Sequence, residues 1–131
     1  MKDKYIIAEI NIGEDEINED IRIINSYEEA KREDKFVDRI YDYQYENEKE
    51  IKEKCIIKIN NKIIPFTYYN KFNEEGKYKI EYLFKGVLTK TDYLFSECNS
   101  LTNIDLSNFN TQNIKDMSYI FKGCHSLTKI N

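Results

Sequence analysis

The 131-residue chain has no tryptophan, one proline and four glycines, and its only alanines are Ala8 and Ala30. Four glycines form no glycine-rich phosphate loop, so the sequence gives no support to nucleotide chemistry. Isoleucine and tyrosine instead dominate the 40% hydrophobic share. Because β-branched and aromatic side chains suit a pleated, half-buried surface, this balance favours strands over helices. An AT-rich genome would produce part of the same bias.

Histidine and cysteine, which supply many metal ligands and nucleophiles, are also scarce. His125 is the single histidine, and no serine or cysteine is placed for it to activate, so we expect no catalysis. Three cysteines without a CxxC pair argue against a disulfide framework and a zinc site. The acidic run 13–20 lacks the glycine and alternating ligands of an EF-hand loop, which favours a solvated loop. We therefore expect no enzyme, no metal and no cofactor.

Charge is spread evenly along the chain, with a net value of −4. No concentrated basic face can be assembled, which argues against a nucleic-acid partner. No apolar run approaches the roughly 20 residues that span a bilayer. The first residues become charged too soon for a signal peptide, which predicts a cytoplasmic protein. A mature fragment of a secreted protein would have the same features, so a cell-surface location stays open.

The clearest pattern is a repeat near the C-terminus. Residues 93–104 align with residues 119–130 at a constant offset of 26, and tyrosine, phenylalanine, cysteine, serine, leucine, threonine and isoleucine recur in register. Leu101, Ile104 and Leu106 have the Leu-x-x-Ile-x-Leu spacing of leucine-rich repeats, whose periods are 20–29 residues. Stacked coils bury one another's apolar sides, so the repeat predicts a solenoid.

Each coil has a predictable course. Ile104 and Leu106 should point inward from a short strand, while Asp105 and Ser107 point outward. Asparagine and threonine at 108–113 supply turn chemistry. The helical spacing of apolar residues that follows predicts a short helix or 3₁₀ turn, which involves Ile114, Met117, Ile120 and Phe121.

The segment from Tyr93 to Asn131 resembles the repeat of BspA-like leucine-rich-repeat surface proteins. The resemblance includes the turn residues Ser-Asn-Phe-Asn-Thr at 107–111 as well as the apolar skeleton. It implies that Phe109 replaces the inward asparagine of the general template with a stacked aromatic column. It also implies a binding or adhesion role without identifying the ligand. Cys98 and Cys124 occupy equivalent positions in adjacent coils, where a disulfide is conceivable but two buried thiols are favoured.

The region before the repeat is predicted to be a small β-rich domain with a short helical insert. Strands are expected at 5–12, 21–25, 55–60, 62–66 and 78–84, and Asn60-Asn61 should form a hairpin turn. Residues 72–80 resemble the penultimate hairpin of immunoglobulin-like sandwiches. Ser26-x-x-Glu29 is a capping box that predicts a helix to about Lys35, and 47–54 forms a second helical turn.

These patterns predict a mainly β (α+β) protein with two parts. Residues 1–84 form a β-sandwich-like capping domain that leads into a leucine-rich-repeat solenoid of about one and a half repeats at 85–131. Ile130-Asn131 corresponds to Ile104-Asp105, so we expect a truncated array, or an open end covered by a partner or a second copy.

The expected function is a non-catalytic protein-interaction or scaffolding module with an unknown protein partner. Its predicted contact surface is the outward side of the repeat strands, formed by Asn103, Asp105, Ser107, Lys129 and Asn131. Self-association through the open repeat end is a further expectation. Two alternatives stay open: a fragment of a cell-surface adhesion protein, and a carbohydrate-binding β-sandwich in which Tyr41, Tyr43 or Tyr45 stacks on sugars.

Overall fold

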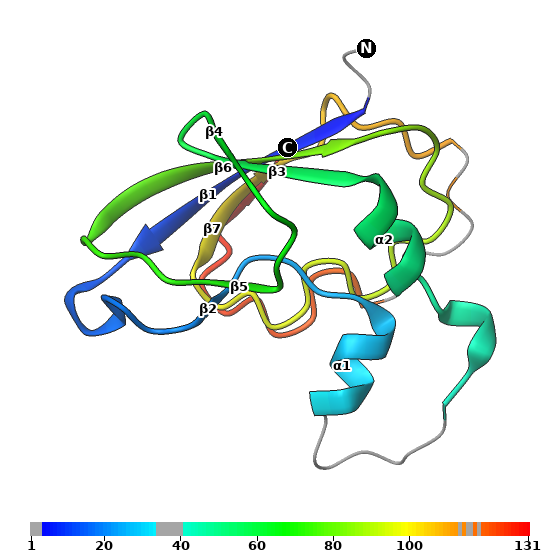
Figure 1. The fold of residues 1–131 in the computed structure, drawn as a ribbon, viewed down its shortest axis with the longest axis horizontal. Coiled ribbons are helices and arrows are strands. Elements are labelled where there is room, and N and C mark those ends of the chain that lie inside the picture. The colour runs from blue at the N-terminus through cyan, green and yellow to red at the C-terminus, as the bar shows by residue number, and fades with distance from the viewer. Residues whose placement is uncertain (1–3, 34–40, 113, 115–116, 118) are drawn as a thin grey trace.

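The computed structural model describes residues 4–33, 41–112, 114, 117 and 119–131. Within them the fold is mainly β, with one mixed six-stranded sheet, a two-stranded sheet and two α-helices (Figure 1). No helix in this described part is long and apolar enough to cross a bilayer. The elements in chain order are β1 (Tyr5–Ile12), η1 (Glu14–Glu16), β2 (Ile21–Arg22), α1 (Tyr27–Glu33), η2 (Tyr43–Tyr45), α2 (Glu48–Lys54), β3 (Cys55–Ile59), β4 (Lys62–Ile64), β5 (Tyr69–Asn70), β6 (Gly76–Phe84), β7 (Leu101–Asp105) and β8 (Lys129–Ile130).

The large sheet has the strand order β4-β3-β6-β1-β7-β8, and it is antiparallel except where β7 meets β8. One side of this sheet faces the core, because every second residue of β1 is almost fully buried, from Ile6 to Ile12. Both helices and the β2–β5 pair lie on that side (Figure 1). The other side carries half-buried and exposed residues, as the period of two in a strand requires.

The predicted β3–β4 hairpin is confirmed. Asn60 and Asn61 have φ values of 47° and 69°, and this left-handed conformation is the one that a tight hairpin turn needs. The strand β4 ends at Ile64, one residue before Pro65, because proline has no N–H to donate to the sheet. The strand expected at 21–25 is shorter than predicted, since only Ile21 and Arg22 pair with β5.

Both predicted helices are present. The Ser26 hydroxyl accepts a hydrogen bond from the Glu29 N–H at 3.1 Å, which caps α1. The Glu29 carboxylate does not complete the capping box, because it binds the buried guanidinium of Arg22 at 3.1 Å. Arg22 also contacts Glu33 and the Tyr69 hydroxyl. These bonds tie β2, α1 and β5 together, and they satisfy a charge that would be costly to bury alone.

The repeat strands β7 and β8 continue the sheet of the preceding region. β1 pairs antiparallel with β7, and β8 pairs parallel with β7 in a register that joins Asn103 to Lys129 and Ile104 to Ile130. This register equals the 26-residue offset of the sequence repeat. The β1–β7 register shifts at Glu9/Ile10, and this bulge lets Leu101 and Ile104 both face the core although they are three residues apart.

The two repeat copies share a left-handed backbone conformation at two equivalent positions. Tyr93 and Tyr119 have φ values of 63° and 57°, and Glu97 and Gly123 have values of 60° and 78°. The rings of Phe95 and Phe121 stack with an interplanar angle of 8°. The helix or 3₁₀ turn expected around 114–121 includes residues 115, 116 and 118, which lie outside the described residues. Residues 119–123 form turns.

Candidate functional site

The predicted contact surface lies at the β7–β8 end of the sheet. Asn103 and Lys129 are neighbours in the parallel register, and the Asn103 amide donates to the Glu9 carboxylate of β1 at 3.1 Å. Hydrogen bonds from the Ser107 hydroxyl and N–H lower the pKa of Asp105 below its ordinary value, and Lys129 adds a weaker effect of the same sign.

Sequence reasoning missed Glu9, because no local pattern indicates that β1 lies beside β7. The remaining predicted residue, Asn131, is exposed and bonds to β7 only through its backbone.

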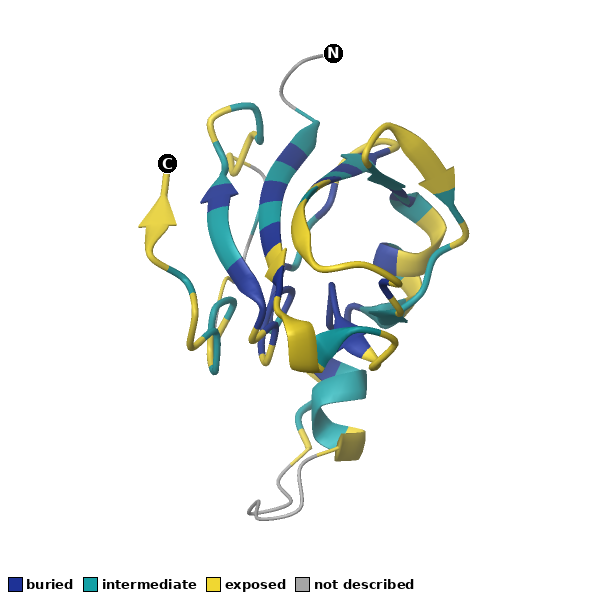
Figure 2. Ribbon diagram, turned by 90° about the vertical axis from the view of Figure 1, so that its left-hand side faces the viewer, coloured by how far each residue is buried: buried dark blue, intermediate teal, exposed yellow. Residues whose placement is uncertain are grey.

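The two repeat copies differ strongly in burial. In the first copy Leu94, Phe95, Cys98, Leu101 and Ile104 are all fully buried. The equivalent residues of the second copy are half-buried or exposed, and Tyr119 and Ile130 are 60% and 52% exposed. Figure 2 shows β8 exposed at the outer edge of the sheet, beside the partly buried β7. We call this surface the coil face, and it is formed by Tyr119, Ile120, Phe121, Leu127 and Ile130.

The coil face also presents backbone groups that have no partner in the part of the chain that the structure describes. In the first copy, the Phe95 and Glu97 N–H groups donate to the Ile120 and Lys122 carbonyls of the second copy at 2.9 and 2.7 Å. The equivalent donors of the second copy are the N–H groups of Phe121 and Gly123, which have no acceptor among the described residues.

The carbonyl groups of β7 and β8 differ in the same way as these N–H groups. The Ile104 carbonyl accepts from the Asn131 N–H at 2.9 Å. The equivalent carbonyl, that of Ile130, belongs to the last strand in the sheet order. The coil face therefore combines exposed apolar side chains with backbone N–H and C=O groups. The equivalent groups of the first copy bind the second copy.

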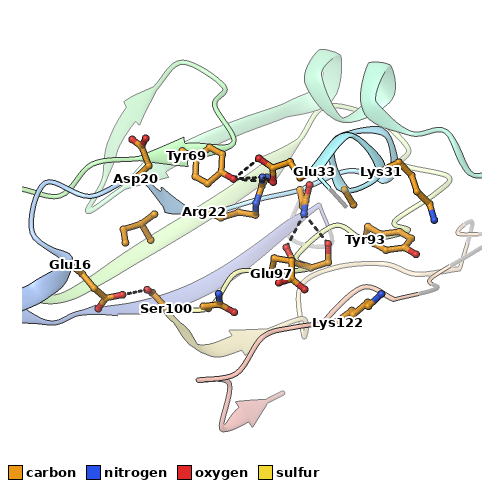
Figure 3. Close-up of a pocket in the computed structure, with 15 residues that line it drawn as sticks. Glu16, Asp20, Arg22, Lys31, Glu33, Tyr69, Tyr93, Glu97, Ser100 and Lys122 are labelled. Carbon is orange, nitrogen blue, oxygen red and sulfur yellow. Dashed lines mark hydrogen bonds and ion pairs between the residues drawn. The ribbon is translucent and has the colours of Figure 1, made fainter. Parts of the chain in front are cut away.

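A second feature is a cleft of about 800 Å³ between the region before the repeat and the turns of the repeat (Figure 3). We call it the junction cleft. Arg22, Tyr69 and Glu33 line one wall, and Ser96 and Ser100 line the other.

One buried side chain joins the two walls of this cleft. Asn25 donates to the Ser96 carbonyl and hydroxyl at 3.0 and 2.9 Å, and its N–H donates to the Leu94 carbonyl. Volumes of 300–1,000 Å³ are typical of ligand sites, so the junction cleft is large enough to hold one.

The tyrosines proposed to stack on sugars pack mainly against one another. The rings of Tyr41 and Tyr45 lie 5.2 and 5.8 Å from that of Tyr27, and the Tyr43 ring lies 5.0 Å from that of Tyr41. Tyr43 is 75% exposed. The Tyr27 ring also contacts Tyr93 at 5.6 Å. The cluster therefore fixes the connection between α1 and α2 against the first repeat copy.

The three cysteines are free thiols. Burial raises the pKa of Cys55 to about 12 and that of Cys124 to about 11, and it raises the pKa of Cys98 well above its ordinary value. Raised pKa values keep the thiols neutral, which disfavours nucleophilic or metal-binding roles. Cys124 donates instead to the Phe95 carbonyl at 2.9 Å, a further contact between the two copies.

Other reactive groups do not cluster. Among the described residues there is no group of three or more histidine, cysteine, aspartate or glutamate side chains that could hold a metal ion. His125 is exposed on a turn of the second copy.

Comparison with known protein families identifies the family of this chain. A family model described as "Mycoplasma protein of unknown function, DUF285" matches residues 36–131, which include both repeat copies. No curated protein and no solved structure matches the chain.

Proposed function

We propose that this chain, which belongs to the DUF285 family, is a non-catalytic protein-interaction module of leucine-rich-repeat type. Residues 1–84 serve as a β-sandwich-like cap, and residues 85–131 form the first coils of a solenoid. The observation that carries the proposal is the contrast between the coil face and its buried equivalent in the first copy.

The preceding region acts as the cap because it covers the first copy. β1 occupies the edge of β7 that an earlier coil would use. Buried Asn25 and Asn47 bind the backbone at the start of this copy, at Leu94 and Ser96 and at Lys90 and Asp92. Such a cap hides the apolar end of a repeat stack from water, as terminal units of solenoids do.

The occupant of the coil face is a further coil with the same repeat motif. It must accept from the Phe121 and Gly123 N–H groups, donate to the Ile130 carbonyl, and cover Tyr119 and Leu127. The second copy does all of this for the first. Another molecule of this chain cannot supply such a coil from its first copy, because β1 covers the side that would dock.

Extension of the chain tests this assignment. A copy of residues 106–131 added after Asn131 should supply the third coil and bury the coil face. The free energy of unfolding should rise by about 2–4 kcal/mol from the apolar area removed from water. The amides of Phe121 and Gly123 should become protected from hydrogen exchange.

The matched control is the same extension with serine at the positions equivalent to Phe121 and Ile130, which should give neither effect. If the intact extension left both amides unprotected, the coil-face assignment would be wrong. Concentration-dependent protection in the original chain would assign the face to self-association instead.

The outward residues Asn103, Asp105, Ser107, Lys129 and Asn131 are the proposed contact surface for a protein ligand. Their position on the uncovered side of the sheet, beside Glu9, supports this role. Alanine at both Asp105 and Lys129 should weaken binding of a ligand isolated with the chain. Unchanged affinity would remove this surface from the proposal.

A further inference from the structure

The junction cleft carries opposite charges at its two ends. Figure 3 shows Glu16 and Asp20 at one end, and Lys31 and Lys122 at the other beside Tyr93. The walls between these ends carry hydroxyl and amide groups together with the charged side chains of Arg22, Glu33 and Glu97. A ligand that fits this cleft must therefore present charges of both signs at a fixed separation.

The two lysines are available to such a ligand. The Lys31 ammonium lies 5.4 Å from the centre of the Tyr27 ring, and the Lys122 ammonium lies 5.5 Å from that of Tyr119. Neither lysine has an ion pair among the described residues. Contacts with ring faces hold both cations in place without neutralising them.

The carboxylates at the other end are available as well. Glu16 accepts hydrogen bonds from the Ser100 hydroxyl at 2.5 Å and the Gly13 N–H at 2.9 Å, and it has no ion pair with any described residue. Asp20 pairs with Lys71, but both side chains are more than half exposed. An exposed ion pair of this kind contributes little to stability, so a cationic group of a ligand can replace Lys71 beside Asp20.

Most of the charge in the middle of the cleft is already paired. Arg22 is buried and bonded to Glu29, Glu33 and Tyr69. The Glu97 carboxylate is the exception, because it is exposed over Gly123 and has no ion pair among the described residues. It adds one negative charge between the two ends, and the two lysines outnumber it at their end of the cleft.

A peptide is the ligand class that carries both signs of charge on one extended backbone, whereas phosphates and acidic sugars carry negative charge alone. We propose that the junction cleft binds an extended peptide segment of a partner protein, with a basic side chain toward Glu16 and Asp20 and an acidic side chain toward Lys31 and Lys122. Between these ends, the exposed Asn99 side chain of the cleft lining is positioned to hydrogen-bond the peptide backbone.

This site uses three parts of the chain. Asp20 and Lys31 come from the region before the repeat, Ser100 from the first copy and Lys122 from the second. The Glu97 N–H donates to the Lys122 carbonyl, so stacking of the two copies places Lys122 at the cleft. The proposal goes beyond the coil face and does not depend on what covers it, although Lys122 borders both sites because its ammonium packs on the Tyr119 ring.

Blocked synthetic peptides test the proposal. The first set has arginine at one end and aspartate at the other, joined by Ser-Gly spacers of two, four or six residues. Control sets have arginine at both ends or aspartate at both ends. Binding to the full chain is measured by calorimetry and by NMR shifts of the cleft amides. The best mixed-charge peptide should bind about tenfold more tightly than either control, and its affinity should fall in high salt.

A charge reversal then tests the lysine end. The double variant Lys31→Glu/Lys122→Glu should transfer the preference to the peptide with two arginines. A matched variant, Lys62→Glu/Lys77→Glu, changes two exposed lysines outside the cleft and should keep the original preference. Lys122→Gln alone should weaken binding of the mixed-charge peptide several-fold. This single variant provides the test if the double variant does not fold.

Equal binding of the three peptide sets would overturn the proposal, as would the absence of any binding at millimolar peptide. So would a charge reversal that leaves the preference unchanged. None of these results would bear on the coil face, which the chain extension tests separately.

Discussion

The two repeat copies share seven of their twelve aligned residues and have positive φ values at the same two positions, yet only the first is largely buried. The first copy lies between β1 on one side and the second copy on the other. Within the described residues, the second copy has a neighbour on one side only. Burial of this motif is thus set by what stacks on it, because a single coil cannot cover its own apolar residues.

Truncation of equivalent phenylalanines should give the largest difference between the copies. Phe95 is fully buried and contacts Tyr82 and Phe121, so Phe95→Ala should cost about 3–5 kcal/mol of unfolding free energy. Phe121→Ala should cost about 1 kcal/mol, because part of its ring is already in water. Urea unfolding of both variants measures the difference, and equal losses would contradict the burial contrast.

The contact between Glu97 and Gly123 should give the next largest effect. A Cβ at Gly123 would lie 2.0 Å from the Glu97 carboxylate, and the φ of Gly123 is 78°. Gly123→Ala should therefore cost about 1–2 kcal/mol, mostly from the left-handed conformation, because the exposed Glu97 carboxylate ends a flexible side chain that can move away from the new methyl group.

Gly86 is the matched control for this substitution, because it also has a positive φ but has no atom within 4 Å of an added Cβ. Gly86→Ala should cost about 1 kcal/mol from conformation alone. The double variant Glu97→Ala/Gly123→Ala should recover the difference in thermal unfolding. Failure to recover it would mean that the two side chains do not meet.

Low pH should weaken the ion pair between Arg32 of α1 and Glu48 of α2. The hydrogen bond from Arg32 lowers the pKa of Glu48 to about 2 from its ordinary value of 4.5. A lowered pKa stabilises the fold above pH 4.5, and this contribution is lost as the pH falls toward 2.

Arg32→Gln should therefore flatten the dependence of unfolding free energy on pH between 4.5 and 2. The effect should be smaller than those of the two preceding substitutions, because Arg32 is half exposed and solvent screens the pair. Lys52→Gln removes a weaker partner of Glu48 and should change the slope less. Identical slopes for both variants would show that Arg32 is not the main partner.

Much of the fold could be predicted where the pattern is local. The alternation in β1 and β6, the Asn60-Asn61 turn and the Ser26 cap were all readable, and the 26-residue offset matches the β7–β8 register. The pairing of β1 with β7 was not predictable, because nothing local in either segment specifies a strand about 95 residues away. Arg22, Asn25 and the junction cleft were missed for the same reason, since their partners come together only in the folded chain. The role of the outward residues of β7 and β8 as a contact surface for a protein ligand stays a prediction.

Hydrogen exchange of four backbone amides tests the central claim most directly. Phe95 and Glu97 donate across the interface between the copies, whereas Phe121 and Gly123 are their equivalents on the open coil face. The account predicts strong protection of the first pair and exchange of the second pair near the rate of an unfolded peptide. Similar protection of all four amides in dilute monomeric protein would contradict it.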